Sequence, residues 1–220
     1  MPQLYEHFND LDHWYLVLEY LVGTTLETYL EMRAAQGERI QVEEALAMVL
    51  QLCTVLEYLH TRQPPIIFRD LKPGNIIRAP GGKLSLIDFG IARPFRPGQT
   101  RDTQPLGSPG YAAPEQYGHA QTTPQTDIYS LGALLHTLLS GQDPSEQRQG
   151  LAPLRVDQLP ELTVLTQRML SVDPGARPAN VREVAAELET MRLMHAAQDA
   201  KRIWLPPTPQ PSAAGGQIQL

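Results

Sequence analysis

Apolar residues recur at three- and four-residue steps over Val42–His60, the most regular stretch of the chain. This spacing places them on one wide helical face and predicts a buried central helix, which ends before Pro64 and Pro65. Further helices are predicted at Leu26–Ala35, with Thr25 as its N-cap, and at Thr126–Ser140, Leu159–Leu170 and Ala179–Met194. The chain is therefore expected to be mainly helical after residue 25.

Short runs of β-branched and aromatic residues predict strands at Leu4–Phe8, His13–Tyr20, Ile76–Ile77 and Leu84–Ile87. The first two runs flank a polar turn and the last two flank a Gly-Gly turn, so two hairpins are expected. Residues 93–109 are rich in proline, glycine and hydroxyl side chains, which predicts an extended loop. The pattern ends near Ala196, and a Pro/Ala/Gly-rich disordered tail is predicted over 196–220.

Composition limits the classes of function. The 220-residue chain is 42% hydrophobic and 19% charged, as in an ordinary globular domain. Its net charge of -6 argues against broad binding to nucleic acid or to an anionic membrane surface. The sequence contains neither a run apolar enough to span a membrane nor a signal-peptide pattern. Cys53 is the only cysteine, which excludes an internal disulfide and favours a cytoplasmic location.

Four short motifs follow one another along the chain: FRDLKPGN at 68–75, DFG at 88–90, GSPGYAAPE at 107–115 and DIYSLG at 127–132. Each alone could arise by chance, and DFG in particular is a weak signal. In this order and at these intervals they form a specific pattern. Over about Leu4–Met194 the chain resembles the eukaryotic-type protein kinases, in their bacterial serine/threonine branch.

The resemblance implies an α+β, protein-kinase-like fold, mainly the helical C-lobe with a remnant β-hairpin and hinge of the N-lobe. Residues 1–195 are expected to form this partial kinase domain, divided into an N-lobe remnant (1–18), a hinge (19–23) and a C-lobe (24–195). The implied activity is transfer of the γ-phosphate of ATP to Ser or Thr hydroxyls of proteins. The implied cofactor is Mg²⁺, with Mn²⁺ as an alternative metal.

The chemistry of phosphoryl transfer explains why these residue types occur together. The reaction needs an oriented hydroxyl and cations that neutralise the charge on the phosphate oxygens. By the resemblance, Asp70 accepts or orients the hydroxyl proton of the substrate, and Lys72 places an ammonium beside the γ-phosphate. Asn75 and Asp88 supply oxygen ligands for Mg²⁺, while Asp127 has the structural task of anchoring the catalytic loop. An isolated aspartate is more often a turn or capping residue, but the complete set favours catalysis.

The nucleotide site is assigned by position in the family pattern. Leu18 lies at the gatekeeper position, and the backbone of Glu19 through Leu21 is expected to pair with adenine. Ile77 is expected to form the floor under the adenine ring while also serving as a core residue.

Two positions depart from the usual family residues. Ser108 replaces a threonine, and its hydroxyl is still expected to bridge Asp70 and Lys72, as in kinases that act on Ser/Thr rather than Tyr. Phe68 stands where a histidine is most frequent, and its ring is expected to pack on Phe89. Neither change is expected to inactivate the site.

Further residues are assigned to regulation and structure. Arg69 directly precedes the catalytic aspartate, an arrangement that often binds a phosphate on the activation loop. Thr100 and Thr103 are the candidate phosphosites, and the alternative is that they are ordinary solvated loop threonines. Glu115 and Arg177 are expected to form a buried ion pair with a structural role.

The chain contains no G-x-G-x-x-G motif and no lysine in a V-A-I-K-like strand, both of which precede the first predicted strand in the family. We therefore expect weak nucleotide binding and little or no phosphoryl transfer by this chain alone. The apolar residues of 1–23 are expected to be covered by a partner or by a missing N-lobe segment. A mis-assigned start codon or a truncated gene would account for such a chain.

Two alternative functions stay open. A non-catalytic, kinase-like (pseudokinase) interaction module is disfavoured by the intact Asp70, Lys72, Asn75 and Asp88, because binding alone has no chemical need for all four. A small-molecule phosphotransferase shares the logic of the catalytic loop. The GSPGYAAPE segment and the long loop before it argue against that function, because they form a platform for protein substrates.

Overall fold

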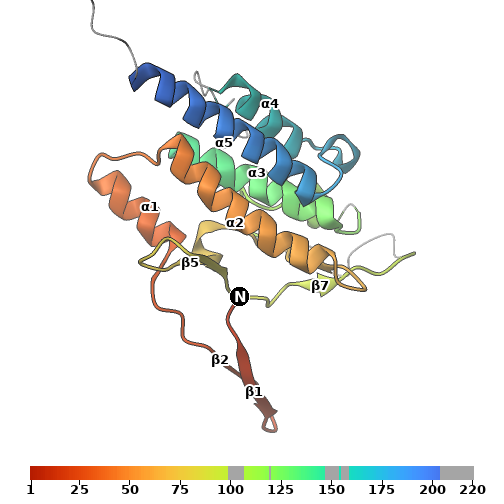
Figure 1. Ribbon diagram of the computed structural model, residues 1–220. Coiled ribbons are helices and arrows are strands. Elements are labelled where there is room, and N and C mark those ends of the chain that lie inside the picture. The colour runs from red at the N-terminus through yellow and green to blue at the C-terminus, as the bar shows by residue number, and fades with distance from the viewer. Residues whose placement is uncertain (99–106, 119, 147–153, 155–158, 204–220) are drawn as a thin grey trace, which may run out of the picture.

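The computed structural model describes residues 1–98, 107–118, 120–146, 154 and 159–203. Its main body is a group of helices, below which lie three small antiparallel sheets (Figure 1). The helices are α1 (Leu26–Ala35), α2 (Val42–His60), α3 (Pro124–Ser140), α4 (Pro160–Met169) and α5 (Val181–Ile203). Short 3-10 helices are η1 (Pro73–Asn75), η2 (Pro114–Tyr117), η3 (Pro144–Glu146) and η4 (Pro174–Ala176).

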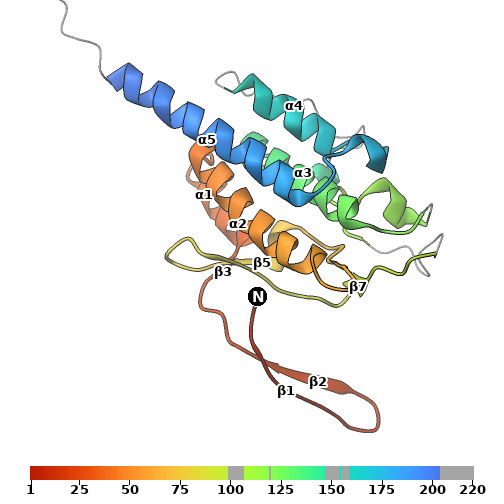
Figure 2. The same cartoon turned by 45° about the vertical axis from the view of Figure 1, so that its right-hand side comes forward.

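Helix α2 is the centre of the core, as its wide apolar stripe predicts. It contacts both α5 and α3, which lie beside it in both views (Figures 1 and 2). Its buried side chains are Ala45, Leu46, Met48, Val49, Leu52, Cys53, Leu56 and Leu59. These side chains form one wide apolar face, and their burial packs α2 against α3 and α5.

The first sheet is a hairpin of β1 (Leu4–Asn9) and β2 (Trp14–Leu18). The second has the order β3-β5-β6, with β3 at Thr24–Thr25, β5 at Ile76–Arg78 and β6 at Leu84–Leu86. The third pairs β4 (Ile66–Ile67) with β7 (Arg93–Pro94). The two predicted hairpins are therefore confirmed.

The β1–β2 hairpin projects away from the helical body in both views (Figures 1 and 2). All residues of both strands are exposed, including Trp14 and Leu16, although Phe8 and Tyr15 stack with ring centroids 5.0 Å apart. Within the described residues, β1 and β2 pair only with each other. A two-stranded ribbon without a packed face is only marginally stable by itself.

The helix boundaries agree with the sequence pattern at α1 and α2 and differ at α5. Thr25 caps α1, since its hydroxyl accepts a hydrogen bond from the Thr28 amide at 3.1 Å. Helix α5 continues to Ile203, which corrects the predicted start of the tail at residue 196. The reason is that alanine, glutamine and lysine favour helix even where the apolar period has ended. Residues 204–220 lie outside the described part of the chain.

No helix within the described residues is long and apolar enough to cross a membrane.

Candidate active site

The FRDLKPGN motif at 68–75 forms a loop between β4 and β5 that ends in η1. Arg69 has a φ of 70°, in the left-handed region that side chains rarely adopt. It lies directly before Asp70, whose side chain is only 14% exposed. Asp88 has the same backbone feature, with a φ of 61°. Strained backbone of this kind persists where the surrounding fold fixes it, and it concentrates at functional sites.

The Ser108 hydroxyl bridges Asp70 and Lys72, as expected from the sequence. It donates to Asp70 Oδ1 at 2.7 Å and accepts from Lys72 Nζ at 2.7 Å. Lys72 Nζ is also 3.5 Å from Asp70 Oδ2. The three side chains thus form one closed polar group that presents a carboxylate, an ammonium and a hydroxyl together.

Asn75, at the end of the same loop, donates two hydrogen bonds to Asp70. Its Nδ2 donates to the Asp70 carbonyl at 2.9 Å and to Asp70 Oδ2 at 2.7 Å. The carbonyl of Asn75 accepts from the Ile87 amide at 2.9 Å, which joins the loop to the end of β6. Asp88 is the next residue, so the loop and the DFG turn meet at this point. Asp88 is exposed, and its Oδ1 accepts from the Gly90 amide at 3.1 Å.

The donor set around Asn75 and Asp88 suits Mg²⁺ better than a metal that needs a closed protein cage. Within the described residues no three His, Cys, Asp or Glu side chains gather as a metal cluster. Mg²⁺ commonly uses one or two protein oxygens together with water and phosphate oxygens. Asp88, one residue beyond the Ile87–Asn75 hydrogen bond, is an exposed carboxylate and could supply one such oxygen.

Asp127 anchors the loop from α3, as the family pattern implies. Its fully buried carboxylate accepts from the amides of Phe68 at 2.9 Å and Arg69 at 2.8 Å. The third contact was not anticipated from the sequence: His60 Nε2, at the end of α2, lies 2.7 Å from Asp127 Oδ2. A lone histidine at a helix end carries no sequence signal of such a role, because its partner lies 67 positions away.

Glu115 and Arg177 form the predicted ion pair. The guanidinium donates to both carboxylate oxygens, at 2.7 and 2.9 Å, and both side chains are buried. Thr126 also donates to Glu115 at 2.8 Å. Burial by itself would raise the pKa of Glu115, but the hydrogen bonds from Arg177, the backbone and Thr126 together lower the pKa below its ordinary value.

Two aromatic rings, those of Phe68 and Phe89, pack against each other where the catalytic loop meets the DFG turn. Phe68 is fully buried and meets Phe89 edge to face, with centroids 5.1 Å apart. This is the contact expected for a phenylalanine at the histidine position, and the geometry is one that aromatic pairs favour. The buried Arg69 donates through Nη1 to the Ile91 carbonyl at 3.2 Å, so it joins the loop to the segment after the DFG turn.

A third support was also not anticipated from the sequence. The buried side chain of Gln116, in η2, donates to the Arg69 carbonyl at 2.8 Å and accepts from the Ala113 amide at 3.0 Å. It thereby connects the GSPGYAAPE segment to the loop. An isolated glutamine after the motif offers no pattern from which this contact could be predicted.

The residues assigned to adenine are not enclosed in this structure. Leu18 is 46% exposed, Glu19 is exposed, and both lie where the projecting hairpin returns toward the body. The Glu19 amide donates to the Gln3 carbonyl at 2.8 Å. Ile77 is partly buried in β5, and Leu21 is also partly buried.

Gly23 fixes the path from the hinge into β3. A Cβ at this position would lie 2.3 Å from the Arg78 carbonyl oxygen, and the φ of Gly23 is 151°. Only glycine allows this close approach. The chain can therefore enter β3 and pair with β5, which holds Thr25 opposite Ile77.

The proposed phosphosites Thr100 and Thr103 lie outside the described residues.

Comparison with known proteins agrees with the geometry. The protein kinase domain family matches residues 2–192, and the chain therefore belongs to this family. A serine/threonine-protein kinase, PknK, of Mycobacterium tuberculosis is 32% identical over 193 residues, which are 81% of this chain and 17% of the relative. Serine/threonine-protein kinase C of Synechocystis is 38% identical over 161 residues, 68% of this chain and 29% of the relative.

A probable serine/threonine-protein kinase of Streptomyces coelicolor is 29% identical over 192 residues. These residues make up 80% of this chain and 28% of the relative. The chain thus spans less than a third of the length of these curated relatives.

Proposed function

We propose that this chain carries the catalytic lobe of a serine/threonine protein kinase, which transfers the γ-phosphate of ATP to Ser or Thr hydroxyls of protein substrates. The observation that carries the proposal is the Asp70–Lys72–Asn75–Ser108 network, in which three hydrogen bonds between side chains are each 2.7 Å long. A carboxylate held between a hydroxyl and an amide is poised to accept a hydrogen bond from an incoming alcohol. The names of the related proteins support the choice of Ser and Thr.

In this proposal each residue has one task. Asp70 orients the acceptor hydroxyl and takes its proton, and Lys72 stabilises charge on the transferred phosphate. Asn75 and Asp88 hold Mg²⁺, for which Mn²⁺ can substitute, and the metal neutralises charge on the phosphates when bound. Ser108 keeps the Asp70 and Lys72 side chains at their positions.

The adenine of ATP would lie against Ile77 and the backbone of Glu19 and Leu21, with Leu18 at the back of the site. These residues are exposed or only partly buried among the described parts of the chain, and the 220 residues contain no Gly-rich loop. We therefore expect weak ATP binding and slow transfer by these residues alone. A partner or an N-lobe segment covering residues 1–23 would strengthen both, because it would also bury the apolar hairpin.

The same exposure supports a second candidate function, a non-catalytic kinase-like module that binds partners. Transfer from radiolabelled ATP to a generic protein substrate, followed by phosphoamino-acid analysis, separates the two. The first function predicts slow, Mg²⁺-dependent labelling of Ser and Thr that Asp70→Asn removes. Labelling no greater than that of Asp70→Asn favours the second function. Rapid labelling by the chain alone would refute the expected weak nucleotide binding.

Two regulatory and cellular assignments also belong to the proposal. Arg69, which directly precedes Asp70, would bind a phosphate on the activation loop, and phosphorylation of Thr100 or Thr103 would supply that phosphate. Mass spectrometry of active protein with neither threonine modified would remove this idea. A single, buried cysteine is consistent with a reducing cytoplasm.

A further inference from the structure

The exposed apolar surface of this chain is concentrated on the β1–β2 hairpin. Of the 19 large hydrophobic side chains that are exposed among the described residues, 12 belong to residues 1–22, a tenth of the sequence. Trp14 and Leu16 of β2 are 75% and 64% exposed. A concentrated apolar patch on the surface of a globular domain marks an interaction site.

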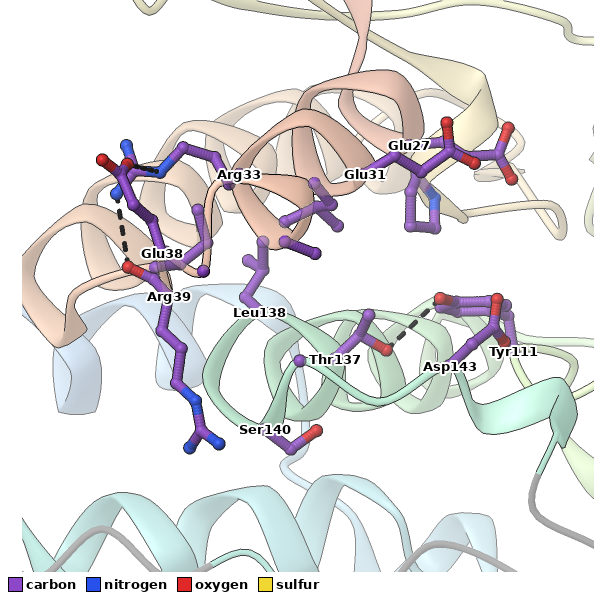
Figure 3. A pocket seen from close by; sticks show the side chains of 16 residues that line it. Glu27, Glu31, Arg33, Glu38, Arg39, Tyr111, Thr137, Leu138, Ser140 and Asp143 are labelled. Carbon is purple, nitrogen blue, oxygen red and sulfur yellow. Dashed lines mark hydrogen bonds and ion pairs between the residues drawn. The ribbon is translucent and has the colours of Figure 1, made fainter.

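The helical body presents a different kind of surface. A cavity of about 510 Å³ opens between α1, the loop after α1 and the end of α3 (Figure 3). Six of the 16 residues that line it are charged. At one end these groups are already held by one another, since Arg33 Nε is 2.8 Å from Glu38 and Arg33 Nη2 donates to the Arg39 carbonyl at 3.2 Å. The cavity therefore lacks the continuous apolar surface that the hairpin has.

Strand β2 has one free edge, and the backbone shows which residues face it. The Asp10 amide donates to the His13 carbonyl at 3.0 Å, and the Glu19 amide donates to the Gln3 carbonyl at 2.8 Å. Backbone groups alternate in direction along a strand, so the odd-numbered residues of β2 face β1 and residues 14, 16 and 18 face the other edge. Within the described part of the chain no strand pairs with that edge.

A second copy of β2 fits this edge when the two strands run antiparallel about a twofold axis at Leu16. This register obeys the backbone alternation, because Leu16 then lies opposite Leu16 of the second copy, and Trp14 lies opposite Leu18. Tyr15 lies opposite Val17, an aromatic and β-branched pair of the kind that stabilises sheets. Registers shifted by two residues pair β2 with residues outside the strand.

The charges at the two ends of β2 are complementary in the same register. His13 directly precedes the strand and Glu19 directly follows it, and both side chains are exposed. Each His13 would therefore lie opposite Glu19 of the second copy, where the imidazole can donate a hydrogen bond to the carboxylate. A parallel arrangement would instead place the two Glu19 carboxylates together, which is unfavourable. The sequence of β2 and its flanks is thus self-complementary only when antiparallel.

We propose that two copies of this chain associate through β2, so that the two hairpins form a four-stranded antiparallel sheet. The hairpin projects away from the helical body in both views, which leaves room for a second copy (Figures 1 and 2). Because β2 is only five residues long, the interface is smaller than that of a permanent dimer, and we expect a dissociation constant in the micromolar range. The inference goes beyond the proposed function and does not depend on phosphoryl transfer.

Sedimentation velocity of the purified 220-residue chain over roughly 1–100 μM tests the association. We expect the mass to rise with concentration from that of one chain to that of two. Leu16→Lys should raise the dissociation constant by at least about tenfold, because two ammonium groups would lie directly opposite each other. Leu11→Lys is the matched control. Leu11 is fully exposed in the turn between the strands, so this change should leave the association intact.

Cysteine substitutions test the register. Opposite residues of a hydrogen-bonded antiparallel pair have Cα atoms about 5.5 Å apart, a distance that a disulfide can span. Mild oxidation of Leu16→Cys should therefore give a cross-linked dimer on a non-reducing gel. Leu18→Cys faces the same side of the sheet but would lie four positions, roughly 13 Å, from its counterpart, so it should not form the cross-link. The native Cys53 is buried and does not compete.

Three results would overturn the inference. The first is a monomer at every concentration, which would leave the edge to a different chain. The second is association that Leu16→Lys does not weaken relative to Leu11→Lys. The third is equal cross-linking by Leu16→Cys and Leu18→Cys. Circular dichroism of each variant establishes that the fold is retained, as expected for substitutions of exposed side chains.

Discussion

Replacing Arg177 with methionine should strongly destabilise the helical body. Arg177 donates two hydrogen bonds to Glu115, at 2.7 and 2.9 Å, and the exposed fractions of the two side chains are 0% and 5%. It also donates to the backbone carbonyls of residues 125, 171 and 172. Methionine preserves much of the volume but leaves the Glu115 carboxylate buried with only its hydrogen bonds from Thr126 and the backbone.

Removing one partner of a buried ion pair costs about 3–5 kcal/mol, because the remaining charge stays desolvated. We expect Arg177→Met to lower the free energy of unfolding by about this amount in urea titrations followed by circular dichroism at pH 7. Arg182→Met is the matched control. Arg182 pairs with Glu57 at the surface, with its side chain 76% exposed, and its loss should cost less than about 1 kcal/mol.

The pH dependence gives a second signature of the same pair. The pKa of Glu115 is lowered in the folded state from its ordinary value of 4.5, so its ionisation stabilises the fold above pH 4.5. That contribution is lost as the pH falls through the folded pKa. Arg177→Met should remove this part of the acid sensitivity. A loss at pH 7 below about 1 kcal/mol, equal to that of the surface control, would refute the assignment of a buried, tightly coupled pair.

Three further substitutions or treatments test other parts of the structure. Gly23→Ala should destabilise the chain by about 1–3 kcal/mol in thermal unfolding. The reason is that the alanine Cβ would lie 2.3 Å from the Arg78 carbonyl oxygen. An unchanged unfolding temperature would contradict this close approach. Burial raises the pKa of the Cys53 thiol to about 12, so an aromatic disulfide reagent at pH 8 should react with it only after urea is added. Rapid reaction of the native chain would show that the Cys53 face of α2 is accessible to solvent. Asp127→Ala removes the carboxylate that the Phe68 and Arg69 amides and His60 contact. It should lower the free energy of unfolding by roughly 2–4 kcal/mol in urea titrations. A decrease under about 1 kcal/mol would argue against Asp127 as the anchor of the loop.

The helical part of the fold could be predicted from the sequence because its signals are local. The apolar period of α2 gives its bounds at Val42 and His60 without reference to any other element, and the hydroxyl of Thr25 marks the start of α1. The end of α5 could not be predicted in the same way. Its last turns contain alanine, glutamine and lysine, which favour helix without an apolar period, so the pattern of apolar residues does not mark where the helix ends.

In the candidate site, too, the residues within motifs could be predicted, whereas isolated residues with distant partners could not. Asp70, Lys72, Asn75 and Ser108 were predicted to come together because the motifs are specific, and the structure brings them together. The supports from His60 and Gln116 were missed, because each is one polar residue whose partner is set by tertiary packing. The enclosure of the residues assigned to adenine could not be predicted from these motifs, and the β1–β2 hairpin beside them is exposed among the described residues.

The measurement that bears most directly on the central claim is a titration of a fluorescent ATP analogue against the purified chain, with and without Mg²⁺. If Asn75 and Asp88 hold the metal between protein and phosphates, wild-type binding is weak but strengthened by Mg²⁺. Asp88→Asn then removes the Mg²⁺ dependence, while the control Glu161→Gln, which changes an exposed carboxylate in the first turn of α4, retains it. Binding that ignores Mg²⁺, or a Mg²⁺ effect that Asp88→Asn leaves unchanged, would contradict the account of this lobe as a phosphoryl-transfer site.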